Sequence, residues 1–231
     1  MAGHSHWAQI KYKKASVDKK RSLMISKLVN LILTAGRDNP NPETNFKLKS
    51  AIERAKDFGV PQEVIDRNLK KLKDKSNNDL EEIILEAYGP EGLAILIKCL
   101  TNNKNRTIND IKHILSKHNA KLAEPGSVLW LFEEKGVISI NKTDFNEMLL
   151  EELSDVIEDF KENDESVQFF VKINDIYKIK SLLEEKKIKI LSTEIQFIPK
   201  NYVKIENEEK VKNLIDELLD YNDVYEVFTN Q

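Results

Sequence analysis

Residues 81–100 read EEIILEAYGPEGLAILIKCL. Two apolar runs flank a Gly-Pro-Glu-Gly turn, in which Pro90 presets φ at the second turn position and Gly92 can adopt a positive φ. The segment therefore predicts two strands joined by a tight turn. A helical stripe follows, and GSVLWLFEEKGVISI (126–140) predicts another pair of strands. Together these segments predict a ββαβ core.

A second α/β block is predicted further along the chain. Residues 144–161 have the apolar spacing of one long amphipathic helix. A strand at 167–173, a helix at 175–187 and a strand at 188–198 are expected after it. The chain ends with an amphipathic helix and the short strand VYEVF (224–228). Because a lone strand must pair with another, we expect it to return to the sheet of the ββαβ core.

The segment before the hairpin predicts a small helical bundle. The first helix runs from Leu23 to Gly36, the second ends at Gly59, and Pro61 is placed in the first turn of the third. Three amphipathic helices with short connections form a bundle. Residues 1–22 lack a helical stripe, so we interpret them as an arm that is mobile or ordered by a partner. The polar stretch KDKSNNDLEE then links the bundle to the next domain.

Positive charge is concentrated in the first third of the chain. Residues 1–75 contain 17 Lys and Arg against 8 Asp and Glu, a balance of +9. The other 156 residues contain 19 against 31, a balance of -12, which gives the net charge of -3. Such segregation is typical of a basic module that meets nucleic acid and an acidic body that does not.

The arm and the first helix supply the candidate phosphate contacts. Eight cations in this region are opposed only by Asp18. They are Lys11, Lys13, Lys14, Lys19, Lys20, Arg21, Lys27 and Arg37. Trp7 and Tyr12 lie among them, and their rings either stack on unpaired bases or pack the arm onto the bundle.

A second candidate site lies in LTNNKNRTINDIKHIL (100–115). Thr107 and Asp110 resemble a capping box, which predicts a helix that starts at Thr107. Its free N–H groups would then lie beside Lys104 and Arg106 and suit a phosphate. Ordinary loop and cap chemistry is the alternative interpretation.

Catalytic and metal chemistry are not indicated. The four histidines have no ligand spacing, since His113 and His118 are five apart and point some 140° away from each other on a helix. No phosphate-binding glycine loop, zinc-protease motif or nucleophile elbow occurs. We therefore expect a non-enzymatic protein without metal or cofactor.

Localisation follows from composition. The single Cys99 lies in an apolar run, which excludes an internal disulfide framework and favours a reducing compartment. Neither a secretory apolar region nor the ~18-residue apolar stretch of a membrane span is present. We expect a cytoplasmic protein with no membrane partner.

Three long segments carry a family resemblance. MAGHSHWAQIKYKKASVDKKR (1–21), NPETNFKLKSAIERAKDFGVPQEVIDRNLKK (41–71) and the stretch from YGPEGL to KGVI (88–138) resemble the YebC/PmpR family of probable transcriptional regulators. The resemblance implies an α+β fold of three domains: an N-terminal three-helix bundle and two ferredoxin-like α/β domains, the last inserted into the middle one. The expected bounds are residues 1–78, then 79–138 with 204–231, then 139–203.

The resemblance also implies function and site residues. Family members are described as DNA-binding transcriptional regulators, and others as translation factors that act at the ribosome. The matching positions are His4, Ser5, Trp7, Lys11, Lys14, Arg21, Asn105, Arg106 and Thr107. This sequence departs from the family pattern at Glu91 and at His6.

These observations predict a probable DNA-binding transcriptional regulator. The first alternative is a ribosome-associated translation factor whose arm binds ribosomal RNA, because lysines directed at phosphate read either polymer. The second is a scaffold whose basic region docks on another protein. The acidic α/β domains are expected to hold a protein partner or a second copy of the chain.

Overall fold

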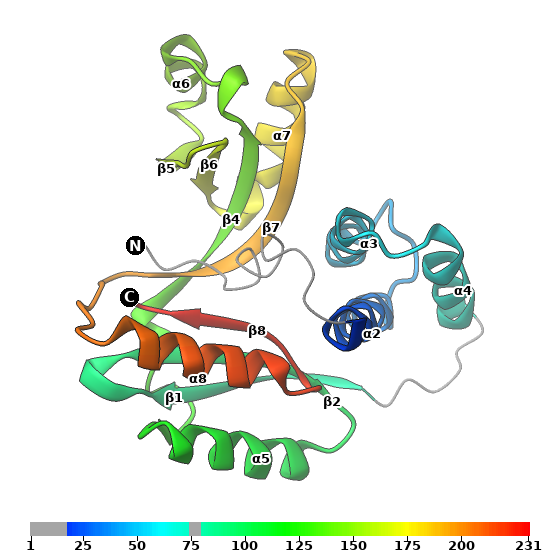
Figure 1. Ribbon diagram of the computed structural model, residues 1–231. Coiled ribbons are helices and arrows are strands. Elements are labelled where there is room, and N and C mark those ends of the chain that lie inside the picture. The colour runs from blue at the N-terminus through cyan, green and yellow to red at the C-terminus, as the bar shows by residue number, and fades with distance from the viewer. Residues whose placement is uncertain (1–17, 74–79) are drawn as a thin grey trace. The chain divides into compact units, whose positions relative to one another are not determined.

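The fold is α+β, as the family resemblance implies, and it contains two four-stranded sheets. The computed structural model describes residues 18–73 and 80–231 (Figure 1). Most of the expected arm, residues 1–17, and the linker residues 74–79 lie outside these ranges. Residues 18–22, also expected in the arm, instead belong to the first helix of the bundle. Two compact units are present: the first runs to Phe132 and resumes at Pro199, and the second comprises Glu133–Ile198.

Three helices form the bundle, as expected. They are α2 (Asp18–Ala35), α3 (Phe46–Phe58) and α4 (Gln62–Lys73). The Asn45 side chain accepts a hydrogen bond from the Leu48 N–H and so caps the start of α3. Gly59 ends α3 in the left-handed region at φ 86°. The apolar faces of the three helices meet in a core that includes Leu28, Ile32 and Leu48.

The first sheet has the strand order β3-β1-β2-β8. Its strands are β1 (Glu81–Tyr88), β2 (Ala94–Thr101), β3 (Lys121–Leu122) and β8 (Val224–Thr229). Because β8 pairs antiparallel with β2, the prediction that the terminal strand returns to this sheet is confirmed. The turn between β1 and β2 contains Gly92 at φ 79°, as its sequence predicts.

Two helices cover one face of the first sheet (Figure 1). They are α5 (Lys104–Lys117) and α8 (Glu208–Asp220). Alternate residues of β2, such as Ile95, Ile97 and Cys99, pack against them. Burial raises the pKa of the Cys99 thiol to about 12, so this cysteine is an apolar core residue.

The predicted strand pair at 126–140 is wrong. A short 3₁₀ helix (Leu129–Leu131) is followed by one strand, β4 (Phe132–Asn141). The preceding loop is instead held by Glu86 of β1, whose carboxylate accepts hydrogen bonds from the backbone N–H groups of Gly126, Val128 and Leu129. These N–H groups therefore do not join a strand ladder.

The single long helix expected at 144–161 is also wrong. The segment contains a short helix, α6 (Glu147–Leu153), and then a strand, β5 (Ile157–Glu162). A strand forms here instead of a helix because Phe160 pairs with Phe169 of β6 (Ser166–Val171). Cross-strand pairing of aromatic residues stabilises a sheet and is invisible to a helical-period count.

The second unit has the element order β-α-β-β-α-β. After β6 come α7 (Ile176–Glu185) and β7 (Ile190–Pro199). The sheet order is β5-β6-β4-β7, and β6 pairs antiparallel with both β4 and β5. None of the helices in the described parts of the chain is long and apolar enough to cross a membrane.

Candidate nucleic-acid interface

Helix α5 begins at Lys104, one turn before the predicted start at Thr107. Asn103 is its N-cap, since the Asn103 side chain accepts a hydrogen bond of 3.1 Å from the Arg106 N–H. The capping-box interpretation of Thr107 and Asp110 is therefore wrong. Asparagine is among the most favourable N-cap residues, so the cap forms at the first position where its side chain reaches back to the helix.

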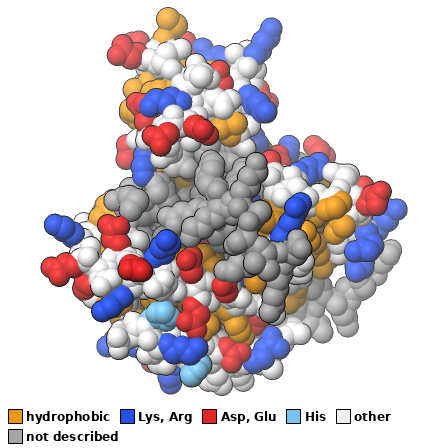
Figure 2. Space-filling model, in the orientation of Figure 1, with side chains coloured by type: hydrophobic (Ala, Val, Ile, Leu, Met, Phe, Trp, Pro, Cys, Tyr) orange, Lys and Arg blue, Asp and Glu red, His pale blue; other side chains and the backbone are white. Residues whose placement is uncertain are grey.

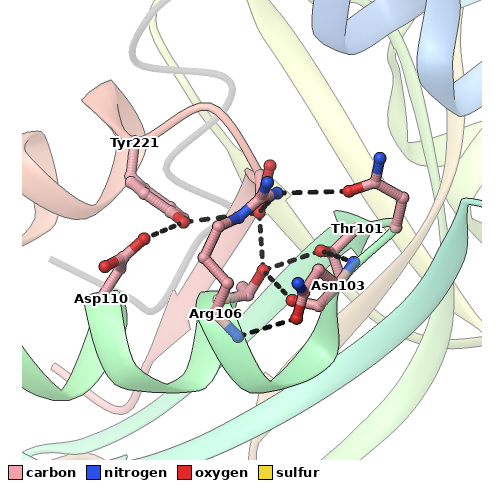
Figure 3. Close-up of polar contacts among 8 residues, drawn as sticks. Thr101, Asn103, Arg106, Asp110 and Tyr221 are labelled. Atoms are coloured by element: carbon pink, nitrogen blue, oxygen red, sulfur yellow. Dashed lines mark hydrogen bonds and ion pairs between the residues drawn. The ribbon is translucent and has the colours of Figure 1, made fainter.

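Figure 3 draws a polar network at the start of α5 around Thr101, Asn103 and Arg106. Thr107 belongs to this network and is fully buried. Its hydroxyl oxygen is 2.6 Å from Oδ2 of Asp223 and 2.8 Å from the hydroxyl oxygen of Thr101. The Thr101 hydroxyl also accepts from the N–H of Asn103. These contacts join the end of β2, the first turn of α5 and the turn before β8. A fully buried hydroxyl in this position does not reach a nucleic acid at the surface, which corrects the expected role of Thr107.

Arg106 lies on the solvent-exposed side of the same network. Its guanidinium lies 3.1 Å from Oδ2 of Asp223 and 3.3 Å from Oδ1 of Asn102. The hydrogen bond to Asp223 raises the pKa of Arg106, so this side chain is charged at all ordinary pH values. About half of the side chain is exposed. The ion pair holds the cation in one orientation and neutralises part of its charge.

Tyr221 closes the network on the side of α8. Its hydroxyl donates a hydrogen bond of 2.7 Å to Oδ2 of Asp110 (Figure 3). Burial and this carboxylate raise the pKa of Tyr221 to about 12. Lys104 and Asn105 are exposed on the first turn of α5. A positive helix end next to Lys104 and a fixed Arg106 is suited to an anion, while Asp223 reduces its net positive charge.

In the bundle, the predicted cations differ in their exposure to solvent. Arg21 and Arg37 are exposed. Lys27 is only 4% exposed, and its ammonium donates a hydrogen bond to the Leu219 carbonyl of α8. Burial lowers the pKa of Lys27 to about 8. The predicted phosphate contact at Lys27 is therefore corrected to an interior contact.

The rest of the predicted arm cannot be placed. His4, Ser5, Trp7, Lys11, Lys13 and Lys14 lie outside the described residues, and Lys19 and Lys20 are described as helix backbone only. Further basic side chains are exposed on α3 and α4: Lys47, Lys56, Arg67, Lys70 and Lys71. Figure 2 shows both basic and acidic side chains over the bundle and over the rest of the face drawn.

Asp223 is the residue that sequence reasoning missed. It accepts from Arg106 and Thr107 although more than 100 positions separate it from either. No local motif marks it. Asn103 did carry a signal, because an asparagine shortly before a helical stripe is a common cap.

Within residues 18–73 and 80–231, no group of three His, Cys, Asp or Glu side chains is placed to hold a metal ion. His118 instead lies 2.7 Å from a carboxylate oxygen of Glu217 on α8, and His113 is exposed.

Two family models match nearly the whole chain. Residues 5–75 match the TACO1/YebC protein N-terminal domain, and residues 80–231 match the TACO1/YebC second and third domain. The chain belongs to the TACO1/YebC family. The predicted resemblance is thus confirmed.

Relatives in this family are similar along their full length. A probable transcriptional regulatory protein of Natranaerobius thermophilus is 39% identical over 239 residues, which cover 100% of this chain and 96% of that protein. One from Thermosipho melanesiensis is 41% identical over 237 residues, covering 100% and 93%. The crystal structure of a conserved hypothetical protein from Aquifex aeolicus has a TM-score of 0.83 and 38% identity, with 98% of this chain and 96% of that chain covered.

Proposed function

We propose that this TACO1/YebC-family protein is a non-enzymatic regulator of transcription that binds duplex DNA. The observation that carries the proposal is the segregation of charge, +9 in residues 1–75 against -12 in the rest. Relatives with about 40% identity are named probable transcriptional regulatory proteins, which supports the same function. Of the eight cations predicted to contact phosphate, Arg21 and Arg37 are the ones whose side chains are described and exposed.

The first turn of α5 supplies a second contact. Lys104, Asn105 and Arg106 are exposed there, and Asp223 orients the Arg106 guanidinium at 3.1 Å. A cation held in one orientation loses less conformational entropy when it meets a phosphate. We therefore include these three residues in the interface and leave out Thr107, which is buried, and Lys27, which is buried while the bundle contacts α8.

Salt dependence of binding tests the proposal. If six cations contact phosphate, the log–log slope of the association constant against salt is about -5 on duplex DNA, at about -0.9 per contact. We expect Lys13, Lys14, Lys19 and Lys20 all changed to Glu to abolish binding. The matched control changes four exposed lysines of the second unit, Lys172, Lys178, Lys187 and Lys189, to Glu, so that both variants have the same net charge. Equal losses in the two variants would contradict a specific basic interface.

Ribosomal RNA is the competing target. A chain that binds structured RNA more tightly than every duplex, and sediments with ribosomes at low salt, would instead be the translation factor of the first alternative. Crosslinking in cells followed by identification of the bound nucleic acid separates the two functions.

The proposal includes three domains and a cytoplasmic location. The element order of the second unit, β-α-β-β-α-β, supports an inserted ferredoxin-like domain. Cys99 is a free, buried thiol, which suits a reducing compartment. Expression of residues 133–198 alone, with a cooperative unfolding transition as the expected result, tests the inserted domain.

A further inference from the structure

Two cations of the bundle contact helix α8 and strand β8 instead of solvent. The Lys27 ammonium of α2 donates to the Leu219 carbonyl in the last turn of α8. The Arg54 guanidinium of α3 lies 3.2 Å from Oε1 of Glu226 on β8. The Arg54 and Glu226 side chains are only 12% and 3% exposed, and Lys98 of β2 also approaches Glu226, at 3.9 Å.

The apolar cores on either side of these contacts are separate. The bundle core, which includes Leu28 and Ile52, contains bundle residues only. The core between the sheet and its helices, which includes Ile97 and Leu218, contains none of them. Glu226 shares its face of the sheet with Leu96 and Phe228, which are both buried, so apolar burial as well as charge is present at this face. Because desolvation of buried charges offsets most of their attraction, the charged contacts themselves add little to the stability of the junction.

Docking of the bundle and binding of nucleic acid would use the same two cations, Lys27 and Arg54. Lys27 and Arg54 belong to the +9 region, yet the docked bundle directs both at oxygen atoms of its own chain. A polyanion offers phosphate oxygens in place of the Glu226 carboxylate and the Leu219 carbonyl. Release of the bundle would expose both cations to it.

We propose that docking of the helical bundle on α8 and the first sheet, through Lys27–Leu219 and Arg54–Glu226, is an autoinhibitory contact that nucleic acid opens by competition. The inference rests on the proposed function, since it describes how that interface is regulated. Its quantitative consequence is a change in affinity. Both cations reach phosphate in the opened, bound state of wild type and variant alike, so weakening the docked state raises the association constant while the salt slope stays close to that of the wild type.

Glu226→Gln weakens the docked state and tests the inference. We expect this variant to bind duplex DNA several-fold more tightly, with a salt slope close to that of the wild type. Glu217→Gln is the matched control, because it removes the same charge from a carboxylate whose partners, Lys117 at 2.9 Å and His118 at 2.7 Å, belong to α5. The control should bind as the wild type does.

The reactivity of Lys27 reports docking directly, without nucleic acid. An amine-acetylating reagent followed by peptide mass spectrometry should modify Lys27 slowly in the wild type, where it is buried, and faster in Glu226→Gln. Glu217→Gln should leave this rate unchanged.

A second variant keeps the inference testable if Glu226→Gln does not fold. Arg54→Gln breaks the same pair from the bundle side and removes one cation, yet it should still raise Lys27 labelling and should not weaken DNA binding. Arg67→Gln removes an exposed cation of α4 and should not raise Lys27 labelling.

The outcomes separate the two proposals. If the wild type binds duplex DNA and Glu226→Gln matches Glu217→Gln in affinity, autoinhibition is wrong and the proposed function stands. Faster Lys27 labelling without tighter binding also overturns autoinhibition. If neither the wild type nor any variant binds duplex DNA, the proposed function itself fails.

Discussion

The Arg106 guanidinium lies 3.1 Å from Oδ2 of Asp223, although 117 positions separate the two residues. The same carboxylate oxygen accepts from the buried Thr107 hydroxyl at 2.6 Å. The Asp223 carboxylate therefore holds both the exposed Arg106 guanidinium and the buried Thr107 hydroxyl in place. The candidate phosphate site on α5 depends on the turn that leads into the C-terminal strand.

Asp223→Ala should destabilise the protein. The change leaves the buried Thr107 hydroxyl without its carboxylate partner, which costs about 1–3 kcal/mol. Urea denaturation measures the loss. Asn222→Ala is the control, because it alters the neighbouring exposed residue of the same turn. Equal stability of the two variants would show that the network adds nothing.

Glu86→Ala should loosen the loop between β3 and β4. The buried carboxylate accepts from the N–H groups of Gly126, Val128 and Leu129 at 2.5–2.7 Å, and their loss should cost about 2–4 kcal/mol. Trp130 follows directly, with its ring N–H bonded to the Ser127 carbonyl.

Fluorescence of Trp130 provides a local measurement of that change. In a Trp7→Phe background it is the remaining tryptophan of two, so a shift in its emission reports the loop. Glu81→Ala, an exposed carboxylate on the same strand, should leave stability and emission unchanged. Unchanged emission in Glu86→Ala would mean that other contacts hold the loop.

Lys27 should make stability depend on alkaline pH. Burial lowers its pKa from 10.5 to about 8, so between these values the folded chain binds fewer protons than the unfolded chain. The contribution of Lys27 to the free energy of unfolding therefore rises with pH across this window, by on the order of 3 kcal/mol, and is absent below it.

Comparison with Lys27→Met isolates this contribution. Cys99 has the opposite effect on stability. Burial raises its pKa to about 12, so above the ordinary thiol pKa the folded chain binds more protons than the unfolded chain, and the free energy of unfolding falls as pH rises. Asp220 and Asp223 also face Lys27, and their attraction favours the charged lysine and so opposes part of the effect of burial. The difference in unfolding free energy between wild type and Lys27→Met should therefore grow from about pH 8 to about pH 10. A constant difference would place the Lys27 ammonium in solvent.

Gly136→Ala should destabilise the second unit. A Cβ at this position of β4 would lie 2.5 Å from Cγ1 of Ile176 and 2.9 Å from Cγ2 of Val171, which crowds a packed core by about 1–3 kcal/mol. At Gly92, open space surrounds the added methyl and only the left-handed φ of 79° is strained, which costs about 1 kcal/mol. Thermal unfolding of the two variants should rank them in that order.

Local pattern was a good guide where one face of an element is apolar. The bundle helices, the hairpin around Gly92 and the terminal strand all lie where their periodicity and turn residues predict. Pattern failed at residues 144–161, where Phe160 satisfies a helical count and a strand alternation equally. The pairing of Phe160 with Phe169 decides for the strand, and no local count contains that partner.

The amino-acid sequence by itself determined the family, the order of most elements and the concentration of positive charge in the first 75 residues. These are properties of neighbouring positions along the chain. Only the tertiary structure decided that Lys27 turns inward to α8 and that Asp223 orients Arg106. The physical reason is that burial and ion pairing depend on which faces of distant elements meet, and helical or strand periodicity specifies a face but not its partner.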